Sequence, residues 1–269
     1  MNRAAAIGRS FAPAKSFFEQ VGEMMILTAR TLVSAVKPPY PYGEEFIGQF
    51  LFALQLCWFP LLISTVAFGF GAPGLQAANV FTLFGTLDRL GGFFVLASIR
   101  EFAPFVTAVV VAGVAGTAIT ADLGARKIRE ELDALQVLGV DPVKNLVVPR
   151  FLALMLVTGM FDVFAVLFGI FGGLVANAVY HQPTGPFFAT FLTNADVTDL
   201  WGSVVKCTLF GAITAIVCCY KGMTASGGAE GVGRAVNQAV VITFLGVFAF
   251  NFVFTQTLLA THPEITVIR

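Results

Sequence analysis

The chain has 269 residues, of which 57% are hydrophobic and only 12% are charged, and its formal net charge at pH 7 is zero. A soluble domain carries about a quarter charged residues, so this deficit, together with long apolar runs, excludes an ordinary soluble fold. The absence of net positive charge argues against nucleic acid as a partner. The sequence therefore predicts an all-α polytopic membrane protein.

The N-terminal part contains an amphipathic segment before the first long apolar run. Residues 1–13 lack the unbroken apolar core of a cleavable signal peptide, so insertion is expected to depend on the internal spans. In residues 14–37, apolar side chains recur at helical spacing and charged side chains occupy other faces. This pattern favours an interfacial helix in the headgroup region, and a helix packed on other protein is the alternative. The predicted N-terminal region covers residues 1–45.

Five membrane spans are predicted in the permease domain, residues 46–260, and residues 261–269 form a short tail. The predicted spans are residues 46–70, about 102–121, 147–180, 200–220 and about 236–260. Each is long enough for a hydrocarbon core of about 30 Å, and the third is so long that part of it must tilt or protrude.

The segment between the first two spans is harder to assign. The sequence Gly71-Ala-Pro-Gly74 is expected to end the first span, and residues 76–99 are predicted to form short re-entrant helices covered by protein. The four cysteines all fall within predicted spans, with no CxxC pair and no histidine cluster nearby, so we expect buried apolar side chains and no metal site.

The distribution of basic residues predicts the orientation. With the N-terminus inside, twelve Lys and Arg residues fall in the inner segments, whereas the clearly outer segments contain only Arg89 and Arg269. The positive-inside rule therefore places the N-terminus, the charged stretch around residues 122–139 and the loop 221–234 in the cytoplasm. The C-terminus is expected outside, and the protein in the cytoplasmic (inner) membrane.

The charged stretch is the most unusual segment, because seven of the twelve residues 122–133 are charged. One helix over residues 122–139 would place Ile128, Leu132, Leu135 and Leu138 on one face. It would also place opposite charges at i,i+4 in the pairs Arg126/Glu130, Lys127/Glu131 and Arg129/Asp133. Gly139 is a predicted C-cap, and Pro142 prevents continuation. Such a helix is either a solvated connection between two spans or a docking helix for a soluble partner.

Several motifs resemble those of one permease family. They are Glu101-Phe-Ala-Pro104, Thr120-Ala-Asp-Leu-Gly-Ala-Arg126, Ile128-Arg-Glu-Glu-Leu-Asp-Ala-Leu135, Leu138-Gly-Val-Asp-Pro142, Leu146-Val-Val-Pro-Arg150 and Gly227-Gly-Ala-Glu-Gly-Val-Gly-Arg234. Together they resemble the MlaE/YrbE family, the permease subunits of ABC transporters that work with MCE-domain proteins, over about residues 14–260. The A-type permeases of actinobacterial Mce operons are the most similar, through residues 121–126, 204–206 and 219–222.

The resemblance implies a function, partners and coupling residues. It implies a permease subunit of an ATP-driven MCE-type transporter that moves a fatty acid, sterol or phospholipid, with import as the expected direction. Residues 122–139 would be the coupling helix that docks on a cytoplasmic ABC ATPase dimer, which would bind ATP and Mg²⁺. MCE-domain proteins would assemble on the outer side. The second permease subunit would be a B-type YrbE partner, although Arg100-Glu101 is more similar to family members that form homodimers. The implied coupling residues are Arg126, Arg129, Glu130, Glu131, Leu132, Asp133 and Leu135.

Charged residues within the spans indicate a substrate cavity. Arg100, Glu101 and Lys206 are expected at a similar depth in the outer half of the membrane, where unpaired charges are costly. Glu101 can pair with Lys206 or with Arg100, and snorkelling of all three to the interface is the alternative. The resemblance implies that these residues line a lipid cavity. Asp162, with no obvious cation at its depth, is a further candidate.

No catalytic site is predicted in this chain. The run Gly227–Gly233 lacks the Lys-Ser/Thr of a phosphate-binding loop, and no nucleophile–base arrangement or metal-ligand spacing is present. We therefore expect a transmembrane subunit that is not itself an enzyme. The competing interpretations are a secondary transporter driven by an ion gradient, which would predict an internal repeat that the sequence does not show, and a membrane scaffold.

Overall fold

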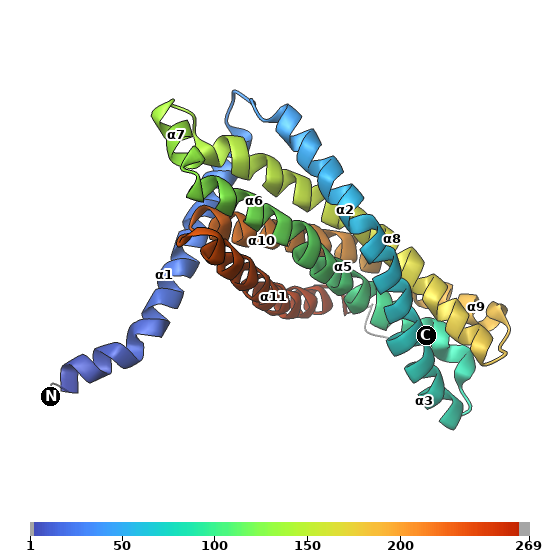
Figure 1. The fold of residues 1–269 in the computed structure, drawn as a ribbon. Coiled ribbons are helices and arrows are strands. Elements are labelled where there is room, and N and C mark those ends of the chain that lie inside the picture. The colour runs from blue at the N-terminus through green and yellow to red at the C-terminus, as the bar shows by residue number, and fades with distance from the viewer. Residues whose placement is uncertain (1–2, 264–269) are drawn as a thin grey trace.

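The computed structural model describes residues 3–263, with side chains from residue 18 onward, and this part of the chain is helical without strands (Figure 1). Five helical runs in it are long and apolar enough to cross a membrane: Gly43–Leu83, Leu87–Ile128, Val143–Val179, Val197–Met223 and Gly228–Thr261. The predicted all-α polytopic fold with five candidate spans is confirmed.

The first two helical runs are each built from several elements. The first run comprises α2 (Gly43–Gly69), η1 (Phe70–Gln76) and α3 (Ala77–Leu83), and the second comprises η2 (Leu87–Arg89), α4 (Leu90–Phe94), η3 (Val95–Phe102), α5 (Ala103–Val111), η4 (Ala112–Gly116) and α6 (Thr117–Ile128). The remaining elements are α1 (Arg3–Val36), α7 (Glu131–Val137), η5 (Val143–Val147), α8 (Val148–Val179), α9 (Thr184–Asn194), α10 (Val197–Met223) and α11 (Gly228–Thr261). We call the two ends of the bundle the α7 end and the α9 end.

Helix α8 forms the centre of the bundle and packs mainly against α2 and α10. Glycines allow these helices to approach closely, as is common between membrane helices. A Cβ atom added to Gly69 would lie 2.3 Å from the carbonyl oxygen of Gly169, and one added to Gly211 would lie 2.5 Å from that of Leu154. The backbones of α2 and of α10 are therefore each in direct contact with that of α8. These contacts fix the positions of the polar side chains on the three helices.

The predicted end of the first span is wrong, whereas residues 76–99 contain the expected short helices α3 and α4, and their re-entrant position stays a prediction. The helix continues through Gly71–Gly74 as the π-helical turn η1 and reaches Leu83, and the chain turns at Gly85, where φ is +66°. A run of 41 residues is about 60 Å long, roughly twice the hydrocarbon thickness. The first two runs are therefore each longer than one membrane crossing needs, and they reach the α9 end (Figure 1), where α4 packs against α9.

Helix α1 lies across the α7 end and projects away from the bundle (Figure 1). It begins earlier than the predicted residue 14. Leu27 and Thr31 are buried against the bundle, whereas Met25, Leu32 and Val36 are exposed. Because part of its apolar surface has no protein cover, the predicted interfacial position in the headgroup region suits α1 better than complete packing on protein.

Candidate functional site

The turn η3 presents two consecutive charged residues to the neighbouring helices. It is π-helical, a geometry that occurs often at functional sites. Arg100 donates from Nε to Oδ1 of Asp199 over 2.6 Å and from Nη2 to Oδ2 over 3.2 Å. The side chain of Asp199 is fully buried in the first turn of α10. This two-point ion pair fixes η3 against α10.

Glu101 and Lys206 form the second ion pair. The Lys206 Nζ atom lies 3.5 Å from Oε1 of Glu101, and it also donates to the hydroxyl of Thr255 and to the carbonyl oxygen of Arg100. Glu101 accepts hydrogen bonds from Asn251 Nδ2 at 2.7 Å and from Thr255 Oγ1 at 2.9 Å. The predicted neighbours Arg100, Glu101 and Lys206 are therefore in one polar cluster shared by η3, α10 and α11.

The exposure of the cluster is uneven. The side chain of Lys206 is only 3% exposed, so it does not snorkel, whereas the side chain of Glu101 is 38% exposed. Phe102 pairs with the exposed ring of Phe68 at 6.2 Å, and the exposed Phe248 lies one helical turn before Asn251. The carboxylate of Glu101 is therefore accessible, and its hydrogen-bond partner Asn251 lies one helical turn from an exposed phenylalanine.

Asp162 lies on α8, fully buried, and neither of its carboxylate oxygens has a hydrogen-bond partner in the described part of the chain. Its neighbours on α10 are Ser203, Lys206 and Cys207, and Lys206 is close enough to act on it electrostatically. The expectation that no cation lies at its depth was therefore wrong. The sequence could not reveal this proximity, because the close packing of α8 on α10 brings together residues 44 positions apart.

Sequence reasoning missed Asp199, Asn251 and Thr255. The predicted fourth span begins at residue 200 and leaves Asp199 outside it, although Asp196 and Asp199 form a capping box at the start of α10. Asn251 and Thr255 are spaced i,i+4 on α11, and a polar side chain within an apolar span is itself an indication of a polar partner. These two signals would have extended the predicted cluster.

The second candidate region is the α6–α7 segment, residues 117–139. The prediction of one helix over residues 122–139 is wrong, because α6 ends at Ile128 and Glu130 adopts a left-handed conformation with φ at 59°. The ion pairs consequently differ from the predicted i,i+4 set. They are Arg126–Asp122 at 3.1 Å, Lys127–Asp133 at 2.9 Å and Arg129–Glu131 at 2.7 Å.

The predicted apolar stripe of this segment is divided by the break. Leu132 is buried and Leu135 packs against the core, whereas Val137 is 87% exposed and Leu138 is 77% exposed. The predicted cap is confirmed. Gly139 has φ at +77°, its N–H donates to the carbonyl of Gln136 at 3.0 Å, and the next N–H donates to Leu135 at 2.9 Å. We call the exposed side chains of Val137 and Leu138, which come just before the cap, the apolar tip.

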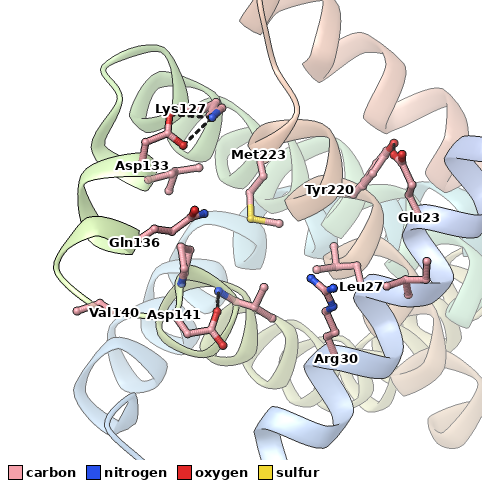
Figure 2. Close-up of a pocket in the computed structure, with 15 residues that line it drawn as sticks. Glu23, Leu27, Arg30, Lys127, Asp133, Gln136, Val140, Asp141, Tyr220 and Met223 are labelled. Carbon is pink, nitrogen blue, oxygen red and sulfur yellow. Dashed lines mark hydrogen bonds and ion pairs between the residues drawn. The ribbon is translucent and has the colours of Figure 1, made fainter.

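A cavity of about 710 Å³ separates α7 from α1 and the end of α10 (Figure 2). Leu27 and Arg30 line it from α1, Gln136 from α7 and Met223 from α10. Beside it, the Tyr220 hydroxyl donates to Glu23, which joins α10 to α1. The side of α7 that faces α1 therefore borders this open cavity.

Within the described range, no group of His, Cys, Asp and Glu side chains is arranged to hold a metal ion. All four cysteines are buried and unpaired, as predicted.

Proteins of similar sequence cover most of the described bundle. The family model described as Permease MlaE matches residues 46–257. A probable ABC transporter permease protein of Synechocystis sp. is 37% identical over 179 residues, 66% of this chain and 68% of the relative. One of Rickettsia typhi is 30% identical over 243 residues, 90% of this chain and 93% of the relative. Protein TRIGALACTOSYLDIACYLGLYCEROL 1, chloroplastic, of Arabidopsis thaliana is 34% identical over 183 residues, 68% of this chain and 52% of the relative.

Proposed function

Because the chain belongs to the MlaE permease family, we propose that it forms the membrane path of an ATP-driven MCE-type lipid transporter. Two similar proteins are named probable ABC transporter permease proteins, and the five apolar runs make this chain a multi-pass membrane subunit. In the proposed assembly, a separate ABC ATPase dimer docks at the α7 end, which faces the cytoplasm. The ATPase dimer itself binds ATP and Mg²⁺. MCE-domain proteins bind on the outer side, and the membrane is the cytoplasmic (inner) one.

The polar cluster around Glu101 is the observation that carries the proposal. A lipid has a polar headgroup and apolar tails, and a site for it needs both kinds of surface. Glu101 supplies an accessible carboxylate, while Phe68 on α2 and Phe248 on α11 supply exposed aromatic surface on neighbouring helices. A sterol hydroxyl or the cationic headgroup of a phospholipid would pair with the carboxylate, a fatty acid would bind in its protonated form, and import is the proposed direction.

The α6–α7 segment is the proposed docking site for the ATPase. The exposed apolar side chains of Val137 and Leu138 form the tip of the segment, and the ion pair Arg129–Glu131 lies at its base. An apolar centre with a charged rim is the usual composition of a protein interface. The open cavity behind α7 leaves room for part of the partner to contact α1 as well (Figure 2).

A second permease subunit is proposed to complete the lipid path. Helix α11 exposes a row of large apolar side chains along the membrane, including Val241, Leu245, Phe248 and Phe252. The same helix carries Asn251, which donates a hydrogen bond to Glu101. Pairing along α11, with a B-type partner or with a second copy, would enclose the Glu101 cluster between two subunits.

Asp162 favours one competing function. A buried carboxylate without hydrogen bonds, near Lys206, is an arrangement that a proton-driven secondary transporter could use. This alternative predicts that a proton gradient alone drives transport by the isolated chain.

One experiment separates the two functions. The chain is purified in mild detergent, the proteins that accompany it are identified, and the resulting complex is reconstituted in liposomes. We expect an ATPase and MCE-domain proteins to co-purify, and lipid movement to require ATP. Transport by the chain alone on a proton gradient, without an ATPase partner, would replace the proposal by the alternative.

A further inference from the structure

A buried arginine joins three helices at the α7 end. Arg150 lies in the first turn of α8 with its side chain 1% exposed. Its Nη2 atom donates to Asp122 Oδ2 on α6 at 2.7 Å, and its Nη1 atom lies 3.2 Å from Glu45 Oε1 at the start of α2. Nη1 also donates to the carbonyl of Leu146 in η5 at 2.9 Å. We call Arg150, Asp122 and Glu45 the three-helix clamp.

Both acidic members of the clamp have additional partners. Asp122 accepts a hydrogen bond from Nε of Arg126 at 3.1 Å, and Arg126 lies two residues before the end of α6. Glu45 accepts from Gln49 at 3.0 Å. The carboxylates therefore extend the clamp towards α7 on one side and along α2 on the other. Each is 40% exposed, so the positive charge is buried while its partners lie at the surface.

The packing of the helices shows why this connection matters. Helix α6 packs mainly against α10 and α11, whereas α2 packs mainly against α8, and α8 also packs closely on α10. Thr120 on α6 donates to the carbonyl of Cys218 on α10. The clamp adds a direct polar connection from α6 to α8 and α2 at the α7 end. Charge-assisted hydrogen bonds of a planar guanidinium are directional, so they resist relative movement of the groups that they join.

We propose that Arg150 is a positioning residue that locks the first turns of α2 and α8 to the last part of α6, so that displacement of α7 is passed to all three helices together. This inference rests on the proposed function, because it assigns α7 as the point where an ATPase acts. Without the clamp, the last part of α6 would be free to move relative to the first turns of α2 and α8. ATP hydrolysis would then continue with less lipid moved.

The test removes one charge at a time at the surface side of the clamp. Glu45→Gln and Asp122→Asn keep the shape of each side chain and lie where a substitution is tolerated, and Arg150→Lys keeps the charge but loses the planar fork. Glu230→Gln is the matched control, because it breaks the exposed Arg234–Glu230 pair, which is 2.7 Å long and joins two residues of α11. Each variant is purified with its partners and reconstituted in liposomes.

We expect the clamp variants to assemble and hydrolyse ATP, with lipid moved per ATP reduced about threefold or more. The control is expected to match the wild type. Spin labels on the exposed Val137 of α7 and Ile47 of α2 give a second readout that needs neither ATP nor lipid. The distance distribution between them should broaden in Glu45→Gln and Asp122→Asn and stay narrow in the control.

The outcomes separate this inference from the function on which it rests. Unchanged label distances in both acidic variants would overturn the clamp, whether or not the wild type transports lipid. A wild type that moves no lipid with ATP contradicts the proposed function, and the label distances still decide whether the clamp holds α7 in place relative to α2. If Arg150→Lys fails to fold, the two acidic variants carry the test.

Discussion

Glu101 differs from the other charged residues of its cluster because a ligand can reach it. Arg100 is committed to Asp199 through two hydrogen bonds, and Lys206 is buried, whereas the Glu101 side chain is 38% exposed. Its carboxylate nevertheless accepts hydrogen bonds from Asn251 and Thr255. These donors hold the carboxylate in place before a ligand binds, which limits the conformational entropy lost on binding.

Glu101→Gln should therefore lower the affinity for lipid more than it lowers the stability of the fold. The substitution removes the charge that pairs with Lys206 but keeps the size of the side chain. A hydrogen bond to a charged group contributes about 1.5–3 kcal/mol, so lipid affinity should fall about tenfold or more. Binding of a fluorescent lipid to the purified complex measures this change. Thr255→Val is the control, because it removes one hydrogen bond without removing a charge, and an equal loss in both variants would contradict the role of the charge.

Asp162→Asn should leave ATP-driven lipid movement intact. An ionised carboxylate buried without hydrogen bonds is unfavourable, and asparagine has the same shape without the charge. The thermal unfolding midpoint in detergent is therefore expected to stay the same or to rise. Liposome transport and the unfolding midpoint are measured on the same preparation. Loss of transport with a stable fold would instead support proton coupling through Asp162.

At the scale of elements, the break at Glu130 decides what the α6–α7 segment can offer to a partner. A left-handed conformation is costly for a residue other than glycine, by about 1–2 kcal/mol, so the surroundings must hold it. The break allows Lys127 to reach Asp133 and turns α7 so that Leu132 faces the core. A continuous helix would have kept the four apolar residues on one side and left no apolar tip.

Leu138→Ser should weaken ATPase binding without destabilising the chain, because Leu138 is 77% exposed. Apolar residues at the centre of an interface can each contribute about 1–2 kcal/mol or more, which corresponds to a loss of affinity of about tenfold. Co-purification and titration of the ATPase measure the effect. Leu132→Ala is the contrasting variant. Leu132 is buried, so its truncation should lower the free energy of unfolding by about 2–5 kcal/mol. Normal ATPase binding by Leu138→Ser would remove the tip from the interface.

At the scale of the whole molecule, the five spans were predictable because apolar composition and length alone determine them. The continuation of the first helix through Gly71 to Gly74 was not, because glycine and proline are tolerated in membrane helices whose neighbours satisfy the backbone. The break at Glu130 was hidden because two short helices and one long helix have the same sequence periodicity. Arg150 and its partner Asp122 lie 28 residues apart, so only the packing reveals their contact.

The orientation of the whole molecule gives the last prediction. All four native cysteines are buried, at 0–1% exposure, so a membrane-impermeant thiol reagent should react only with a cysteine introduced at the surface. Leu138 at the α7 end and Leu192 on α9 are both highly exposed, at 77% and 70%. Because basic residues concentrate at the α7 end, Leu138→Cys should react in inverted vesicles and be protected in intact cells, and Leu192→Cys should show the opposite pattern. The reverse labelling pattern would place the docking tip on the side without ATP, and no ATPase could then act there.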